Sequence, residues 1–296
     1  MKRDKKICCN HKGMTLIELL AGIAIVGVLG TIVYAASASA LSQADAVSES
    51  ATARQMVTAF LLYPQDNGGS FPRGKGVEQR PIEGFGGNVF GSGEPTAMRW
   101  PWKVAGMMDG GARGLFTDVH QPIYHHMSQR DNEYHVSLIP SLGLNYVLVG
   151  GNYENGTVSP EAVDRQGRGD RTGTPRYPFD YCVTRLDTAY QPGKLIVFVS
   201  TFSFLLPTGW TGDESTTGYY IAEPPKSPSG ANWGNYNEEI PASMGHVHLR
   251  HNDKAVVAHL DGSVAMLNED ELRDMTRWSN QAAKFNDPNF SNWKQR

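Results

Sequence analysis

The feature that most constrains this chain is a run of 26 residues, Leu19 to Ala44, that contains no charged side chain. Its first part, Leu19 to Val33, consists almost entirely of Leu, Ala, Ile, Val and Gly. A helix needs roughly 20 consecutive apolar residues to span a bilayer, so the run predicts a membrane-spanning helix. One carboxylate, Glu18, lies at its apolar edge, where a charge is costly and usually has a partner.

Three interpretations of this run compete. The simplest is a plain membrane anchor. The second is a secretory signal peptide, which the basic N-terminus and the small-residue sites Ala36-Ser37-Ala38 and Ala38-Ser39-Ala40 favour. Against it, the apolar region is longer than the roughly 7–15 residues of a typical signal peptide, and a glutamate near its start is unusual.

The third interpretation rests on the residues just before the run. Gly13 followed by Met14-Thr15-Leu16-Ile17-Glu18 resembles the cleavage and methylation site of type IV prepilins and type II secretion pseudopilins. The resemblance implies that a prepilin peptidase cuts after Gly13 on the cytoplasmic side and that Met14 is then N-methylated. Most members have phenylalanine at that position. Glycine suits the cleavage point, because a protease can approach its backbone closely.

The same resemblance gives Glu18 a role in assembly. In the family, this glutamate is thought to meet the N-terminal amine of a neighbouring subunit and to set the axial register of a helical filament. A carboxylate in an apolar layer is penalised when it is unpaired, which agrees with such a role. The implied partners are the peptidase, further copies of the chain, other pseudopilins and an inner-membrane assembly platform.

Charge predicts how the chain is oriented. Residues 1–13 hold five basic side chains against Asp4 alone, and basic residues favour the cytoplasmic side of a span. We therefore expect a single-pass inner-membrane protein whose globular part is periplasmic, or extracellular in a filament. Loss of residues 1–13 changes the net charge from −3 to −7, which does not indicate nucleic-acid binding. Cys8 and Cys9 would be lost too, and Cys182 alone cannot form an internal disulfide.

We expect the helix to continue beyond the membrane. Residues 1–13 are predicted to be a leader, 14–40 the span, 41–63 an amphipathic continuation and 64–296 a globular domain. Apolar residues recur at three- and four-residue spacing, with charged ones, Glu49 among them, between. The predicted apolar face consists of Leu41, Ala44, Val47, Ala51, Met56, Ala59 and Phe60. Pro64 is predicted to end the helix at the preceding residue.

The globular part is predicted to be an antiparallel sheet with large loop insertions, and the fold class is therefore α+β, pilin-like. Strands are expected at 144–149, 179–183 and 194–199, the last one central because it is the most apolar. Residues 246–267 read as a three-stranded meander whose second turn is Asp261-Gly262. Asn268 and Glu271 then form a capping box for a helix that runs to about Trp278.

His251, nine residues and then Asp261-Gly262 resemble the H-X9-DG segment of many prepilin-like proteins. A functional interpretation makes His251 and Asp261 a metal or proton-relay pair. The structural interpretation, which we favour, makes His251 a hydrogen-bonding residue of a turn, with Asp261 and Gly262 shaping another loop. Strand geometry allows the two sites to lie at opposite ends of one strand.

Other candidate ligands and anchors are less specific. His120, His125, His126 and His135 are expected to be polar surface residues. A zinc site built from His246, His248, His251 and His259 is a less favoured alternative. No metal or other cofactor is predicted, with calcium at Asp213-Glu214 or Glu269-Asp270 left open. Trp100-Pro101-Trp102 is expected to anchor its loop on the domain, with a sugar- or partner-binding pair as the alternative.

These observations predict a structural protein rather than an enzyme: a subunit of a type IV pilus-like or type II secretion pseudopilus filament. The sequence contains neither a G-x-S-x-G nucleophile elbow nor an H-E-x-x-H motif. The alternative is a secreted or membrane-anchored periplasmic hydrolase, or a carbohydrate-binding protein, with an ordinary signal peptide. The mature N-terminus distinguishes the two.

Overall fold

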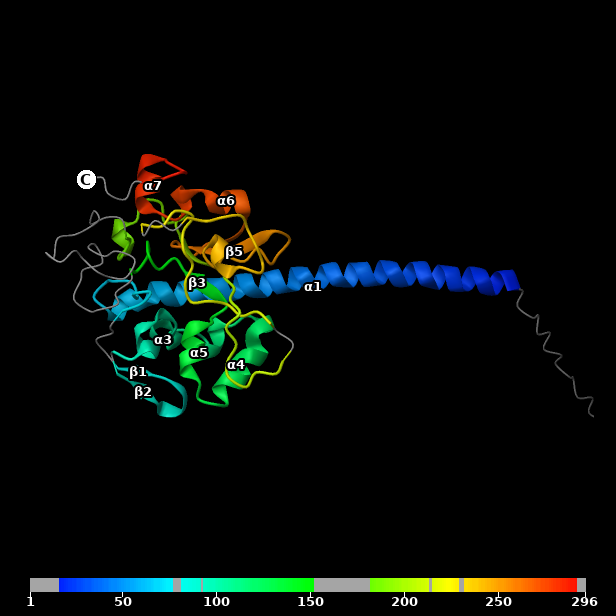
Figure 1. Ribbon diagram of the computed structural model, residues 1–296, viewed down its shortest axis with the longest axis horizontal. Helices are drawn as coiled ribbons and strands as arrows, with labels where there is room; N and C mark the ends of the chain where they lie inside the picture. Colours follow the sequence, from blue (N-terminus) through cyan, green and yellow to red (C-terminus); the bar gives the residue numbers. More distant parts are fainter. Residues whose placement is uncertain are drawn as a thin grey trace, which may run out of the picture. The chain divides into compact units, whose positions relative to one another are not determined.

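The computed structural model of the chain describes residues 16–76, 81–91, 93–151, 182–212, 215–228 and 232–291 (Figure 1). It comprises two compact units, residues 1–44 and 45–296. One helix, α1 (Leu16–Asp66), contributes to both. Gly13 and Met14, and most of the predicted strand at 179–183, lie outside the described residues.

The first unit is the apolar part of α1. Every residue from Leu16 to Tyr34 is exposed, and this 19-residue segment has a mean hydropathy of 2.4. It is long and apolar enough to cross a membrane. The predicted apolar N-terminal helix is therefore confirmed.

The second unit begins with the remaining turns of α1, whose buried face differs from the predicted one. Leu41, Ala44, Val47 and Ala51 are exposed. The buried stripe instead starts at Glu49 and continues through Ala53, Met56, Val57, Ala59 and Phe60. These positions follow the three- and four-residue spacing of one helix face. The prediction is therefore confirmed at Met56, Ala59 and Phe60 and wrong at the four earlier positions. It failed there because the stripe begins with a charged residue, which the sequence pattern assigned to the solvent side.

Pro64 does not end α1, contrary to the prediction. It lies in the final turn, and the helix continues to Asp66. Proline lacks a backbone N–H donor and disfavours helical geometry in the residue before it. Because Pro64 lies in the last turn, this destabilises only the end of the helix. The turn that follows the helix contains Gly68 and Gly69, whose φ angles of 64° and 78° are left-handed and favour glycine.

The main sheet is antiparallel and has the order β3-β4-β5-β6. Its strands are β3 (Leu142–Leu144), β4 (Ile196–Ser200), β5 (Lys254–His259) and β6 (Val264–Asn268). All five residues of β4 are buried, and the strand lies inside the sheet, as its apolar sequence predicted. Phe60 of α1 contacts Phe198 of β4 edge-on, with ring centroids 5.6 Å apart. A helix packed on an antiparallel sheet confirms the α+β class.

Three predicted strands are shorter than expected. The segment 144–149 is a strand only as far as Leu144, after which the chain turns. Val183 forms an isolated bridge to Val149. The first strand of the meander is reduced to a bridge between Val247 and Thr201, so it pairs with the end of β4 instead of β5. Pairing partners distant in sequence decide these lengths, and local apolar patterns do not reveal them.

The C-terminal hairpin and its helix cap follow the prediction. β5 and β6 pair in register, Ala255 opposite Leu267, and Gly262 in the turn has a φ of 87°. Asn268 and Glu271 form the capping box of α6 (Glu269–Arg273). That helix ends early because Asp274 is extended and caps the next turn, η7 (Met275–Arg277), by accepting from the Thr276 amide. Helix α7 (Asn280–Phe285) follows.

Short elements cover the rest of the second unit (Figure 1). They are β1 (Ile82–Glu83), η1 (Phe85–Gly87), β2 (Val89–Phe90), α2 (Pro95–Met98), α3 (Trp100–Ala105), η2 (Gly111–Leu115), η3 (Asp118–His120), α4 (Gln121–Ser128), α5 (Glu133–Leu138), η5 (Leu186–Thr188) and η6 (Pro241–Met244). Trp100 is fully buried and its indole N–H donates to the Tyr220 carbonyl. Trp102 donates to the Glu133 carbonyl at 3.0 Å. Both indoles therefore anchor their loop on the domain, as predicted.

Candidate functional site

The first candidate site is the start of α1. Glu18 lies in its first turn and is exposed, flanked by the exposed apolar residues Ile17 and Leu19. The predicted processing residues Gly13 and Met14 lie outside the described residues. A carboxylate near a helix N-terminus is favoured by the helix dipole. A carboxylate on an otherwise apolar face also provides one defined polar contact point in an apolar layer.

The second candidate site is buried, where α1 meets the residues just before β5. Glu49 is 2% exposed, and its Oε2 accepts a hydrogen bond from Nε2 of His251 at 2.6 Å. Nε of Arg250 lies 3.5 Å from the same oxygen. Nη2 of Arg250 donates to the carbonyls of Ser141 and Thr201 at 3.3 and 2.6 Å. The guanidinium thus joins the helix carboxylate to two loops.

The electrostatics of this cluster favour an ionised glutamate. Burial alone raises the pKa of Glu49, but the Arg250 guanidinium, the His251 hydrogen bond and the neighbouring Ser200 hydroxyl outweigh it and lower that pKa to about 2. A buried carboxylate is tolerated only with such partners. Glu49 Oε1 has no hydrogen-bond partner among the described residues. The pairing therefore depends on Oε2, where the histidine and arginine converge.

Two further histidines surround the cluster and are held neutral. His120 is 4% exposed, and its Nδ1 lies 2.6 Å from the Ser141 hydroxyl. Burial, aided by the Arg250 charge, lowers the pKa values of His120 and His248 to about 3. The prediction that His120 is a surface residue is therefore wrong. Local sequence cannot show that η3, a loop beside Ser141 and the end of β4 enclose it.

These neutral histidines predict acid sensitivity. The unfolded chain takes up protons near pH 6.5, whereas folded His120 and His248 resist them down to about pH 3. The contribution of these histidines to the free energy of unfolding is therefore fully present above pH 6.5. It is lost as the pH falls below that value, by about 2 kcal/mol per histidine between pH 7 and 5. Urea unfolding of the full chain in detergent measures this. His248→Gln should reduce the pH dependence, whereas the exposed His125→Gln should leave it unchanged.

The residues of the H-X9-DG segment lie at opposite ends of β5. The backbone of His251 closes the turn at Asn252-Asp253 through reciprocal hydrogen bonds with Lys254, while its side chain reaches Glu49. Asp261 lies in the β5–β6 turn, where its Oδ1 accepts from the Ser263 amide at 2.8 Å. Hydrogen bonds from Ser263 lower the pKa of Asp261. The structure therefore does not bring His251 and Asp261 together.

The metal alternatives find little support among the described residues. No group of three or more His, Cys, Asp or Glu side chains in that part of the chain is arranged to hold a metal ion. Asp213-Glu214 lies outside the described residues. Glu269 is occupied by an ion pair with Arg273 at 2.6 Å. Of the other histidines, His246 donates from Nδ1 to the Phe202 carbonyl at 3.2 Å, and Nδ1 of His259 lies 3.1 Å from the Ser263 hydroxyl.

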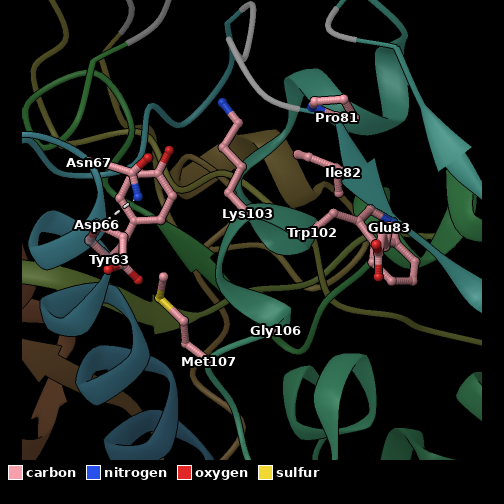
Figure 2. Close-up of a pocket in the computed structure, with 10 residues that line it drawn as sticks. All are labelled: Tyr63, Asp66, Asn67, Pro81, Ile82, Glu83, Trp102, Lys103, Gly106 and Met107. Carbon is pink, nitrogen blue, oxygen red and sulfur yellow. Dashed lines mark hydrogen bonds between the residues drawn. The ribbon is translucent and has the colours of Figure 1, made fainter.

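A separate pocket of about 380 Å³ opens between the end of α1, β1 and α3 (Figure 2). It is lined by Tyr63, Asp66, Asn67, Pro81, Ile82, Glu83, Trp102, Lys103, Gly106 and Met107. Nζ of Lys103 donates to the carbonyls of Arg73 and Gly76 at 3.2 and 3.1 Å. The lysine therefore holds the chain after α1 in place, and its ammonium is engaged by backbone oxygens.

Sequence reasoning missed Glu49, Arg250 and His120 as members of a single buried cluster. Glu49 and His251 are about 200 residues apart, and no local motif connects them. One signal was present: a charged residue in register with the apolar positions Ala53, Met56 and Phe60. A charged residue in line with apolar positions on one helix face is a candidate for a buried ion pair.

Comparison with known proteins addresses the N-terminal segment. Residues 8–34 match the family model of the prokaryotic N-terminal methylation motif. No curated protein and no solved structure matches the chain. The matched segment includes the predicted processing residues, Glu18 and the apolar part of α1, but not the H-X9-DG segment. The N-terminal segment thus carries a prepilin-type methylation motif, which supports the predicted resemblance to type IV prepilins and pseudopilins.

Proposed function

We propose that this chain is a structural subunit of an envelope filament, either a type IV pilus-like filament or a type II secretion pseudopilus. The methylation motif at residues 8–34 carries the proposal. Prepilin peptidase removes residues 1–13 on the cytoplasmic side, and Met14 becomes the methylated N-terminus. The role is structural rather than enzymatic, and the domain from residue 45 onward lies outside the cytoplasm.

In this proposal, Leu16–Tyr34 serves first as a single-pass inner-membrane anchor and then as filament core. Its exposed apolar side chains suit both surroundings, since each excludes water. Glu18 contacts the N-terminal amine of a neighbouring copy. Other pseudopilins and the assembly platform in the inner membrane are the expected further partners.

The buried cluster supports a load-transmitting role for α1. A filament subunit is held through its helix, so its domain must not separate from that helix. Glu49 ties α1 to the segment before β5 through His251 and Arg250, and Phe60 packs on β4. These contacts join the helix to the centre of the sheet. The part of α1 from residue 49 onward and the sheet should therefore move together.

N-terminal mass spectrometry of the chain purified from its native host tests the proposal. The expected product begins at Met14 and carries a methylated amine. Deletion of the prepilin peptidase should leave residues 1–13 attached. A mature chain that begins at Ser39 or Leu41 would contradict the proposal and would favour the secreted hydrolase or carbohydrate-binding protein with an ordinary signal peptide.

A further inference from the structure

The pocket between the end of α1, β1 and α3 carries a carboxylate on each side. Figure 2 shows Asp66 with Tyr63 on one side and Glu83 with Trp102 on the other, with Met107 below. The volume of about 380 Å³ is near the lower end of the range for ligand pockets, roughly 300–1,000 Å³. The pocket therefore has room for one small molecule or one long side chain.

Both carboxylates lack a partner within the described part of the chain. Asp66 and Glu83 are exposed, and neither forms a hydrogen bond or an ion pair with a described residue. Lys103 lines the same pocket, but its Nζ donates to the carbonyls of Arg73 and Gly76 instead of to these carboxylates. With one ammonium against two carboxylates, the lining carries a net negative charge.

The nitrogen donors of the lining side chains are already engaged. Nε1 of Trp102 donates to the Glu133 carbonyl at 3.0 Å. Nδ2 of Asn67 donates to the Tyr63 carbonyl at 2.9 Å. Nζ of Lys103 is held by the two carbonyls named above. The pocket thus offers acceptors rather than donors, and the ligand that matches it brings N–H donors and positive charge.

The rest of the lining is apolar and selects the body of the ligand. Tyr63, Ile82 and Trp102 are buried, and Met107 is half-buried. A sugar stacks on an open aromatic face, which rings of residues only 8% and 6% exposed, Tyr63 and Trp102, do not offer. A calcium ion requires six to eight oxygen ligands and has no use for apolar walls. A cation at the end of an apolar stem fits both parts of the lining.

We propose that this pocket binds an arginine side chain of a partner protein. A guanidinium has five N–H donors and no acceptor, and its donors point in several directions, which suits a carboxylate on each side. The ammonium of lysine is a compact and more strongly hydrated charge. The free amino acid fits less well, because its α-carboxylate would meet an acidic lining. The residues that carry this inference all belong to the second unit, so it does not depend on the filament role.

Isothermal titration calorimetry of the full chain, in an uncharged detergent at low salt, tests the proposal. The probe is N-acetyl-arginine methylamide, which presents the side chain as it occurs within a polypeptide. The citrulline analogue is the matched control ligand, because a neutral urea replaces the guanidinium at almost the same shape. We expect the arginine probe to bind about tenfold more tightly than the citrulline probe, and binding to weaken as salt is added. Free L-arginine should bind less tightly than the blocked probe.

Two variants locate the binding. Asp66→Asn and Glu83→Gln should each weaken binding of the arginine probe about threefold to fivefold. Asp66 lies in the last turn of α1, where the helix dipole disfavours a carboxylate, so its loss should not destabilise the helix. Asp109→Asn is the matched control, because Asp109 is exposed and lies outside the pocket lining. The fluorescence of the buried Trp100 and Trp278 checks that each variant is folded.

Several results would overturn the proposal. If the arginine probe does not bind, or binds no better than the citrulline probe, the pocket does not select a guanidinium. If Asp109→Asn weakens binding as much as the two pocket variants do, the attraction comes from the general acidity of the surface. If free L-arginine binds as tightly as the blocked probe or more tightly, the site recognises a small molecule and not a partner protein.

Discussion

A Glu18→Gln chain is expected to be cleaved after Gly13 and yet to form no filaments. Glutamine keeps the size of the side chain and removes the negative charge that the N-terminal amine of a neighbour requires. The amine that cleavage would create at Met14 is positively charged, and a neutral glutamine cannot compensate that charge. Removing one partner of a buried pair costs about 3–5 kcal/mol, and a filament would bear that cost at every subunit contact.

A partner within the same chain is the competing arrangement. Glu18 follows Met14 by only four residues in the sequence, so the two groups belong to the same short segment. An internal pair would neutralise both groups without any neighbour. The Glu18→Gln experiment distinguishes the two, because loss of an internal pair would leave contacts between subunits intact.

The variant is expressed in the native host, its processing is confirmed by mass, and filaments or secretion are then assayed. Asp45→Asn is the matched control, since it removes an exposed carboxylate from the same helix outside the apolar segment. The control should assemble normally. Normal assembly by a processed Glu18→Gln protein would show that charge pairing at this position does not organise the filament.

A Glu49→Gln chain is expected to lose about 3–5 kcal/mol of the domain's free energy of unfolding. The change removes the charge on which both Arg250 and His251 converge, with the 2.6 Å hydrogen bond between Glu49 and His251 at its centre. The guanidinium is then left largely buried without its counter-charge. A loss of this size is a large part of the 5–15 kcal/mol that typically stabilises a domain.

Urea unfolding of the full chain in detergent measures the effect. All six tryptophans follow residue 45, so their fluorescence reports the domain and not the apolar helix. Glu269→Gln is the control, because its ion pair with Arg273 is partly exposed and should contribute at most about 1 kcal/mol. A Glu49→Gln loss no larger than that of the control would falsify the assignment of this cluster as the connection between helix and sheet.

A double variant tests whether the cluster acts as a unit. Groups in one hydrogen-bond network show non-additive effects, typically by 0.5–3 kcal/mol. Once Glu49 is neutral, His251→Gln should cost less than it does in the wild-type chain, because the strongest hydrogen bond of the imidazole has already been lost.

The parts of the fold that follow from local physical chemistry could be predicted from the sequence. Leu16–Tyr34 is apolar at every turn, so its helix needs no tertiary partner to be recognised. The β5–β6 hairpin was evident because Asp261-Gly262 joins two apolar strands and Gly262 tolerates a φ of 87°. The Asn268–Glu271 capping box was equally local, since both its hydrogen bonds lie within three residues.

The sequence by itself also determined the N-terminal motif, because the motif is one continuous segment of the chain, residues 8–34. Only the tertiary structure decided which face of α1 is buried and what His251 does. Glu49 appeared to be a solvent-facing charge until His251 and Arg250, about 200 residues later, were placed beside it. Likewise His120 is neutral only because folding brings it into a desolvated site near Arg250. Burial and charge pairing depend on neighbours in space, and residues far apart in the chain supply them.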